Sequence, residues 1–260
     1  MKRLLTIAGS DSGGGAGIQA DLKTFHAFGC YGMSVLTAVT AQNTLGVHGV
    51  QDLPPEFVVL ELESVVSDIG VDAVKTGMLS NAEIIHALAQ KIRELQIPHL
   101  VVDPVMRAKG GDPLLKDDAQ QAIIDEIVPL AEVITPNLPE AEVLSGIQIY
   151  TKDDMKEAAK IIHYKGSQNV LVKGGHRKED AVDILFDGKE FTEFFAEKIP
   201  TKNTHGTGCT YSAAISANLA LGKNVKKAIS ISKIFITEAI RNSLNLGHGI
   251  GPLNHFVKIV

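Results

Sequence analysis

The sequence predicts an α/β fold in which a central, mostly parallel β-sheet lies between two layers of helices (a three-layer αβα arrangement). Short apolar and β-branched runs alternate along the chain with longer stretches of helical period, as in repeated strand–helix units. After Lys173 this alternation gives way to two apolar runs on either side of Asp187-Gly188. That pattern predicts a small antiparallel hairpin at one edge of the sheet.

The elements of the first half follow in order. The predicted strands are short apolar runs that stop at glycine, threonine or aspartate: Leu4 to Ala8, Met33 to Val39, Ala73 to Thr76 and His99 to Val102. The predicted helices carry apolar residues at spacings of three and four: Ile18 to Phe28, Glu56 to Val66 and Ala82 to Leu95. The second of these begins after Pro54-Pro55, and proline favours the first turn of a helix.

The second half repeats the alternation and then ends in helices. The predicted strands are Glu132 to Ile134, Val170 to Lys173, and the hairpin strands Val182 to Phe186 and Phe191 to Phe195. The predicted helices are Asp117 to Ile127, Met155 to His163, Cys209 to Leu221 and Val225 to Leu244. No internal repeat, proline-rich linker or charge block marks a boundary, so we expect one domain over residues 1–260.

Composition excludes several classes of function. With 25 Lys and Arg against 30 Asp and Glu, the net charge is −5, which does not suit binding to a nucleic-acid backbone. The apolar run after Arg3 is too short for a signal peptide, and no run is long enough to span a membrane. Cys30 and Cys209 lie far apart, which suits a reducing compartment. We therefore expect a cytoplasmic protein that binds neither nucleic acid nor membranes.

Chemically useful residues follow six of the predicted strands. In a parallel α/β sheet the ligand binds beyond the carboxyl ends of the strands, so these residues predict a ligand site. The segments are Gly9 to Gly17, Thr40 to Thr44, Lys75 to Met78, Asp103 to Met106, Thr135 to Glu140, and Lys173 to His176. The alternative is a rim made only of turns.

Two glycine clusters stand out. Gly13 to Gly17 matches neither G-x-G-x-x-G nor the P-loop, and it allows the backbone to approach a small ligand or forms only a tight turn. Thr204 to Thr210 contains Gly206 and Gly208 directly before an apolar helix. A helix start with free N–H groups is an anion site, typically for phosphate; the alternative is a flexible helix entry.

Three charged residues at strand ends complete the candidate site. Asp103 and Glu140 are carboxylates that, close to phosphates, would favour Mg²⁺. Asp103 could instead cap a turn, and Glu140 could simply begin a helix after Pro139. Lys173 could neutralise phosphate charge or remain solvated.

Taken together, these motifs resemble the hydroxymethylpyrimidine/phosphomethylpyrimidine kinases of thiamine biosynthesis, within the ribokinase-like superfamily. The resemblance runs nearly end to end. The segments that carry it are Ala8 to Thr24, Thr37 to Thr44, Lys75 to Leu79, Val102 to Met106, Ile134 to Glu142, Val172 to His176 and Asn203 to Thr210. It implies two successive phosphoryl transfers from ATP, with Mg²⁺. The first converts 4-amino-5-hydroxymethyl-2-methylpyrimidine to its monophosphate, and the second converts this to the diphosphate. A homodimer is also implied.

The resemblance assigns roles to individual residues. Gln42 would pair with the aminopyrimidine edge, because an amide both donates and accepts. Four further residues would line the same pocket: Gly9, Asp21, Val39 and Met78. The anion hole for the phosphoryl group would come from the helix start at Gly206, Thr207, Gly208 and Cys209. Lys173, Asn137 and Thr207 would meet ATP, while Asp103 and Glu140 would place Mg²⁺.

Cys209 takes the position at which many ribokinase-like sugar kinases have a catalytic aspartate. A helix N-terminus lowers the pKa of a thiol from its usual ~8.5, so we expect Cys209 to act as a base or to orient the substrate alcohol. Phosphoryl transfer is largely dissociative, and positioning counts for more than a strong base.

Two other functions compete with this prediction. The nearer is a pyridoxal kinase of the same branch, against which Gln42-Asn43-Thr44 argues. The other is a non-catalytic protein that senses the pyrimidine, against which the phosphate-handling residues argue. The segment Lys109-Gly110-Gly111 could close over the site or be a plain surface loop.

Overall fold

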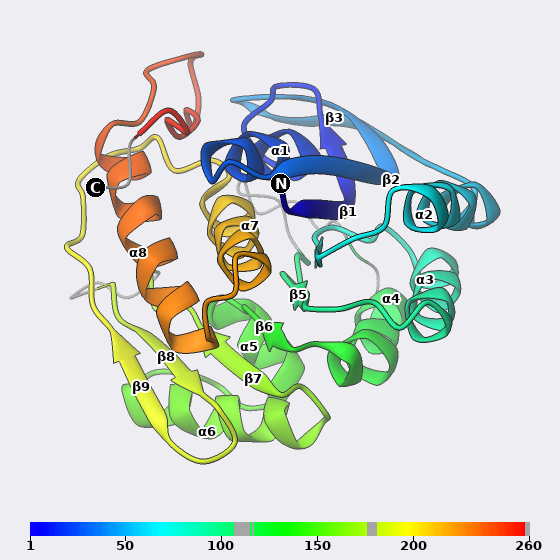
Figure 1. The fold of residues 1–260 in the computed structure, drawn as a ribbon. Coiled ribbons are helices and arrows are strands. Elements are labelled where there is room, and N and C mark those ends of the chain that lie inside the picture. Colours follow the sequence, from blue (N-terminus) through cyan, green and yellow to red (C-terminus); the bar gives the residue numbers. More distant parts are fainter. Residues whose placement is uncertain (107–114, 116, 176–180, 258–260) are drawn as a thin grey trace.

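A computed structural model describes residues 1–106, 115, 117–175 and 181–257. The Lys109-Gly110-Gly111 segment and His176 lie outside these residues. The described chain forms a sheet of nine strands in the order β3-β2-β1-β4-β5-β6-β7-β8-β9 (Figure 1). The strands are β1 (Arg3–Asp11), β2 (Tyr31–Asn43), β3 (Gly46–Asp52), β4 (Ala73–Thr76), β5 (Leu100–Val102), β6 (Val133–Ile134), β7 (Asn169–Val172), β8 (Asp183–Phe186) and β9 (Phe191–Phe194).

The predicted mostly parallel sheet with an antiparallel edge is confirmed. Strands β2, β1, β4, β5, β6 and β7 run parallel to one another. Beyond them, β8 pairs antiparallel with β7, and β9 pairs antiparallel with β8. The opposite edge is antiparallel too, because β3 pairs with β2. This strand was not predicted. Gly46–Asp52 is exposed or half-buried throughout, so it shows no alternation of apolar and polar residues.

Helices cover both faces of the sheet, as predicted. They are α1 (Gly17–Ala27), α2 (Pro55–Asp68), α3 (Ala82–Glu94), α4 (Asp117–Ala122), α5 (Leu138–Ser145), α6 (Lys152–Tyr164), α7 (Thr207–Ala220) and α8 (Val225–Arg241). A π-helical turn, Ile123–Ile127, continues α4. Residues of α2 to α6 pack on one face in the largest apolar cluster, and residues of α1, α7 and α8 pack on the other (Figure 1).

Helix α7 is the central helix of its layer. Every residue from Thr210 to Ala220 is buried, and the helix packs against α1, α8, β1, β4 and β5. A helix buried on all sides needs an apolar surface all round, which explains the run of small and apolar residues. Its N-terminus is thereby held over the carboxyl ends of the central strands.

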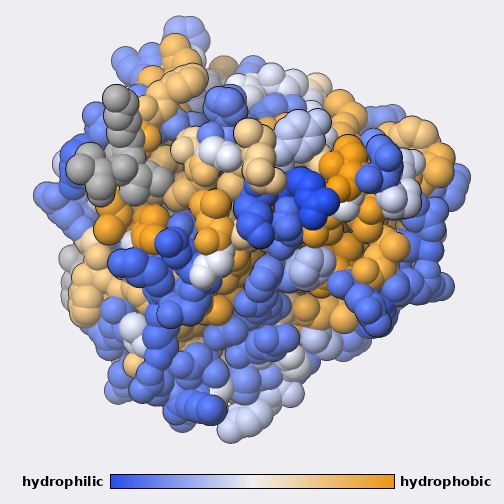
Figure 2. Space-filling model, in the orientation of Figure 1, coloured by the Kyte–Doolittle hydropathy of each residue, from blue (hydrophilic) through white to orange (hydrophobic). Residues whose placement is uncertain are grey.

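The surface in the same orientation carries hydrophilic side chains over most of its area, with apolar side chains between them (Figure 2). Among the described helices, none is long and apolar enough to cross a membrane.

Candidate active site

Strand alternation places the polar residues of the site on one face of the sheet. Side chains two residues apart on a strand point to the same face. Ala73, Val101 and Leu171 pack against the layer of α1, α7 and α8. Two residues further along each strand come Lys75, Asp103 and Lys173. They therefore continue that face at the carboxyl ends of β4, β5 and β7, at the N-terminus of α7.

Asp103 and Lys173 form an ion pair across the middle of the sheet. Lys173 Nζ lies 2.8 Å from Asp103 Oδ1, and Thr135 Oγ1 donates to the same oxygen at 3.2 Å. Asp103 is buried, and the Lys173 side chain is 12% exposed. Burial alone would lower the pKa of Lys173, but Asp103 and then Glu140 raise it above its usual value. Lys173 therefore keeps its positive charge in the site.

Glu140 and Asn137 build the start of α5. The Asn137 side chain accepts from the Glu140 backbone N–H at 3.0 Å, and the Glu140 carboxylate accepts from the Asn137 N–H at 2.9 Å. This reciprocal capping box satisfies two N–H groups at the helix start. Glu140 does begin a helix, and it also lies in the wall of the cavity described below.

Burial raises the pKa of Glu140 to about 7; Lys173 opposes this effect and the charge of Asp103 adds to it. Unfolded, the group titrates near 4.5. Between pH 4.5 and pH 7 the folded state binds more protons than the unfolded state. The free energy of unfolding therefore falls as the pH rises through this range, and the fall is complete above about pH 7. The titration of Glu140 therefore makes the free energy of unfolding about 3 kcal/mol lower above pH 7 than below pH 4.5.

Glu140→Gln removes this titration but keeps an oxygen that can accept from Asn137. In the absence of nucleotide we expect its thermal midpoint to exceed that of the parent by several degrees at pH 8 and to approach it at pH 4. Calorimetry at both pH values measures the effect. An equal difference at the two pH values would contradict it.

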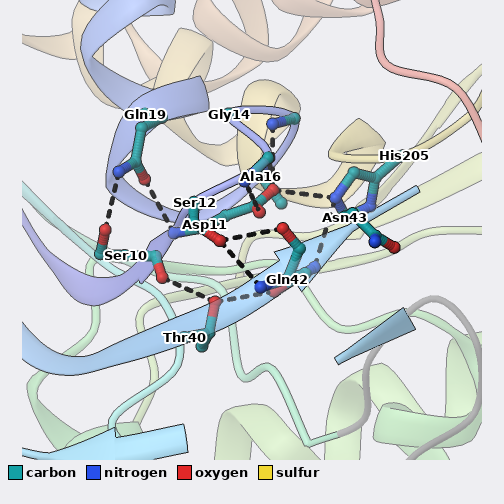
Figure 3. A network of polar contacts seen from close by, with 12 residues as sticks. Ser10, Asp11, Ser12, Gly14, Ala16, Gln19, Thr40, Gln42, Asn43 and His205 are labelled. Carbon is teal, nitrogen blue, oxygen red and sulfur yellow. Dashed lines mark hydrogen bonds and ion pairs between the residues drawn. The ribbon is translucent and has the colours of Figure 1, made fainter. Parts of the chain in front are cut away.

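Asp11 organises the glycine-rich loop between β1 and α1 (Figure 3). Its carboxylate accepts from the backbone N–H groups of Gly13, Gly15 and Ala16 at 2.8 to 3.0 Å and from His205 Nε2 at 2.9 Å. Burial alone would raise the pKa of Asp11, but the His205 and backbone hydrogen bonds lower it. The loop is thus a fixed backbone cradle and is tied directly to the second glycine cluster.

Gln42 lies against the same network. Thr40 Oγ1 donates to Gln42 Oε1 at 3.1 Å, and Gln42 Nε2 lies 3.4 Å from His205 Nε2 (Figure 3). Its backbone is held by Ser12 Oγ, which accepts from the Gln42 N–H at 2.8 Å. The pairing of β2 with β3 shifts register between Ala41 and Gln42. The amide of Gln42 is therefore held in one place, half-buried, beside the glycine-rich loop.

The second glycine cluster forms the start of α7, as predicted. Gly206 is the N-cap, with φ of 82°, and a Cβ there would overlap the carbonyl oxygen of Gly15. Only glycine combines this left-handed backbone with such a close approach. Thr207 Oγ1 donates to the Thr204 carbonyl at 2.7 Å. The two glycine clusters therefore lie side by side, and the first turn of α7 contains Gly208 and Cys209.

The expected low pKa of Cys209 was wrong. Burial raises the pKa of the thiol to about 11, while Lys75 opposes this effect and the carboxylates of Asp21 and Asp103 add to it. A helix N-terminus favours the thiolate, but burial removes water from the sulfur and disfavours the charged form more strongly. In the free site Cys209 is a neutral thiol at pH 7.

A cavity of about 620 Å³ brings most of the predicted residues together. Those in its wall are Gly9, Gln42, Met78, Asp103, Asn137, Glu140, Lys173, Gly206, Thr207, Gly208 and Cys209. Two predicted pocket residues are placed elsewhere. Val39 is 45% exposed and points away, because the buried Ala38 and Thr40 occupy the alternate positions of β2. Asp21 is fully buried beneath the wall, paired with Lys75.

Several residues of the cavity carried no predicted role. Lys75 was noted only as part of a strand end, and no base role was assigned to His205. Lys233, Asp183 and Tyr211 also line the cavity, where Lys233 Nζ contacts Asp183 Oδ2 at 2.6 Å. Their positions on α8, β8 and α7 are far apart in sequence, and only the tertiary structure joins them. No local signal could have indicated this pair.

Comparison with known proteins identifies the family. The pattern of the phosphomethylpyrimidine kinase family matches residues 11–254. The chain belongs to the phosphomethylpyrimidine kinase family. It is 50% identical over 256 residues to the hydroxymethylpyrimidine/phosphomethylpyrimidine kinase of Bacillus subtilis, covering 98% of this chain and 94% of that one. The predicted resemblance and the predicted kinase activity are thereby confirmed.

Two further relatives extend the comparison. The chain is 54% identical over 255 residues to the thiamine biosynthesis bifunctional protein of Geobacter sulfurreducens, covering 98% of this chain and 52% of that one, so it spans about half the length of that relative. The crystal structure of an ADP complex of Bacillus subtilis pyridoxal kinase superposes with a TM-score of 0.91 at 46% identity, covering 98% of this chain and 97% of that one. This likeness confirms the predicted ribokinase-like fold.

Proposed function

We propose that this protein phosphorylates 4-amino-5-hydroxymethyl-2-methylpyrimidine with ATP and then phosphorylates the monophosphate to the diphosphate. The observation that carries the proposal is that residues suited to a heteroaromatic ring and residues suited to phosphates line one cavity. Gln42, which can read a heteroaromatic edge, lies in the same cavity as the α7 N-terminus and the Lys173–Asp103 pair, which suit phosphates. The ADP complex of the pyridoxal kinase relative supports a nucleotide in this fold.

The chemistry requires positioning more than a strong base. The hydroxymethyl oxygen forms a bond to the γ-phosphorus, the bond from that phosphorus to the bridging β-phosphate oxygen breaks, and the hydroxyl proton leaves. Charge on the transferring group is stabilised by the backbone N–H groups of Thr207, Gly208 and Cys209 and by the Lys173 ammonium. Cys209 orients the alcohol, and its thiolate form accepts the hydroxyl proton late in the transfer.

Mg²⁺ fits the carboxylates of this cavity. Within the described ranges, no cluster of three or more His, Cys, Asp or Glu side chains is arranged to hold a metal. Mg²⁺ commonly needs only one or two carboxylates, with water and substrate phosphates as its other ligands. Asp103 and Glu140 would supply them. Burial and, after it, the charge of Asp103 raise the pKa of Glu140, and a divalent cation would offset the effect of that charge. The ion would offset negative charge on the ATP phosphates.

The alternative, pyridoxal phosphorylation, is favoured only by the likeness to pyridoxal kinases. Gln42 tests which activity the site supports, because its amide is proposed to hydrogen-bond the aminopyrimidine. A site built to hydrogen-bond a substrate loses affinity for it when one partner is removed. We expect Gln42→Leu to raise KM for hydroxymethylpyrimidine at least tenfold. KM for ATP should stay within about twofold of the parent value.

Asn43→Leu is the matched control, since Asn43 is exposed and accepts from the Leu45 N–H rather than contacting the cavity. Steady-state kinetics with both substrates measure the effect. If Gln42→Leu and Asn43→Leu change KM for the pyrimidine equally little, Gln42 does not recognise it.

We further propose that the enzyme acts as a homodimer in the cytoplasm, as a single domain over residues 1–260. Its reduced cysteines, Cys30 and Cys209, suit that compartment. Light scattering after size-exclusion chromatography measures the oligomeric state.

A further inference from the structure

Lys75 is an unusual residue in the wall of the cavity. Its side chain has no exposed surface, yet it lines the cavity, as Cys209 does. Lysine is almost never fully buried unless it is paired. Its partner is Asp21 on α1: Nζ lies 2.9 Å from Oδ2, and the same oxygen accepts from Thr6 Oγ1 at 2.6 Å. The other oxygen of Asp21 has no hydrogen-bond partner among the residues that the structure describes.

The surrounding chain is shaped to hold the ammonium. Lys75 Nζ lies so close to Gly77 that a Cβ on that glycine would be 2.7 Å from it. Glycine at this position of the Lys75-Thr76-Gly77 turn therefore leaves room for the cation. Thr6 and Lys75 are paired residues on β1 and β4, and Asp21 reaches both from α1.

Stability alone does not explain a buried pair of this kind. Replacing a buried ion pair by apolar residues of similar volume is often neutral or stabilising, because both charges must be removed from water. A pair retained under the wall of a catalytic cavity therefore points to a role in that cavity.

Lys75 and Cys209 lie in the wall of the same cavity, on β4 and on α7, and these two elements pack against each other. Burial raises the pKa of Cys209. The positive charge of Lys75 lowers this pKa, and it does so more strongly than the hydrogen bond from the Gly17 backbone. The effect is reciprocal: after Asp21, Cys209 is the largest influence that raises the pKa of Lys75. The carboxylates of Asp21 and Asp103 act on Cys209 in the opposite sense.

We propose that Lys75 is a positioning residue for Cys209, with Asp21 fixing the ammonium so that its charge stabilises negative charge on the sulfur. The inference rests on the proposed role of Cys209. A small fraction of the thiol loses its proton to water. The thiolate then receives the proton of the substrate hydroxyl as the new O–P bond forms and the bond from the γ-phosphorus to ADP breaks. Lys75 holds its own proton throughout.

The test measures the thiol itself in the complete enzyme without substrates. Site-resolved mass spectrometry follows alkylation of Cys209 by iodoacetamide from pH 7 to pH 10, which reports the thiolate fraction. We expect Lys75→Met to slow alkylation about tenfold at each pH, which corresponds to one pKa unit. Lys75→Arg should restore most of the rate, because it returns the charge.

Lys233→Met is the matched control for alkylation. Lys233 is also a buried lysine in the cavity wall with an aspartate partner, Asp183, but it lies on α8 against the Tyr211 ring. Its removal should change the alkylation rate of Cys209 less than twofold. An effect as large as that of Lys75→Met would show that any buried charge matters and would overturn the proposal.

A second variant guards against misfolding, because Lys75→Met leaves Asp21 buried without a counter-charge. Lys75→Met combined with Asp21→Asn removes both charges. Because Asp21 raises the pKa of Cys209, this double variant should alkylate faster than Lys75→Met but still more slowly than the parent. A folded double variant that alkylates at the parent rate or faster overturns the proposal. Failure of the proposed role of Cys209 looks different: Cys209→Ala would then retain turnover, whatever the alkylation rates. Failure of the proposed function would leave the parent enzyme without a phosphorylated pyrimidine product.

Discussion

Cys209→Ala is expected to lower kcat for hydroxymethylpyrimidine at least a hundredfold while KM for the pyrimidine changes less than about threefold. Proton transfer by a positioned side chain contributes typically 10²–10⁴-fold. The loss falls on kcat because the thiol acts on the reacting hydroxyl rather than on the ring that Gln42 reads. Steady-state kinetics together with calorimetric titration of the pyrimidine separate the two effects.

Cys30→Ala is the matched control for this variant. Cys30 is buried in the apolar cluster of α1 and α7 and does not line the cavity. We expect it to leave kcat within about twofold of the parent. Near-normal turnover of Cys209→Ala would show that the thiol has no part in the transfer.

Lys173→Met is expected to lower kcat/KM for ATP about a thousandfold. The substitution removes the cation that would face the transferring phosphoryl group, and losing one such donor costs about 10²–10³-fold. It also leaves Asp103 buried without its partner at 2.8 Å, which repels the nucleotide. Kinetics with varied ATP measure the loss, and a thermal scan shows whether the variant is folded.

Lys226→Met provides the comparison for Lys173→Met. The Lys226 side chain is 41% exposed and pairs with Asp187 and Glu190 at the surface. Surface ion pairs of this kind contribute little to stability. Its kcat/KM should stay within about twofold of the parent. If a folded Lys173→Met variant retains a tenth or more of the parent activity, phosphate stabilisation does not depend on this lysine.

Much of the fold could be predicted because periodicity is a local property. The run from Ala73 to Thr76 and the Asp187-Gly188 hairpin were located closely, since each is bounded by clear turn residues. Strand β3 was missed because its side chains are exposed on both faces and impose no pattern on the sequence. Helix α5 was expected only as the alternative explanation of Glu140, which could begin a helix after Pro139.

The positions of site residues could be predicted where they depend on sheet topology. Their ion pairs and pKa values could not, because these depend on the packing of the folded chain. Residues after parallel strands must meet at one edge, so Asp103 and Lys173 could be placed together in advance. The pairing of Asp21 with Lys75 depends on how α1 crosses β4, which spacing does not reveal. The pKa of Cys209 was misjudged for a related reason: its burial comes from the whole cavity wall, not from the helix that carries it.

The most direct test of the account is a product assay. Purified protein is incubated with Mg-ATP and either hydroxymethylpyrimidine or pyridoxal, and ³¹P NMR resolves monophosphate from diphosphate over time. The account predicts that the pyrimidine monophosphate appears first and that the diphosphate follows. Pyridoxal phosphate alone, or no product from either compound, would contradict it.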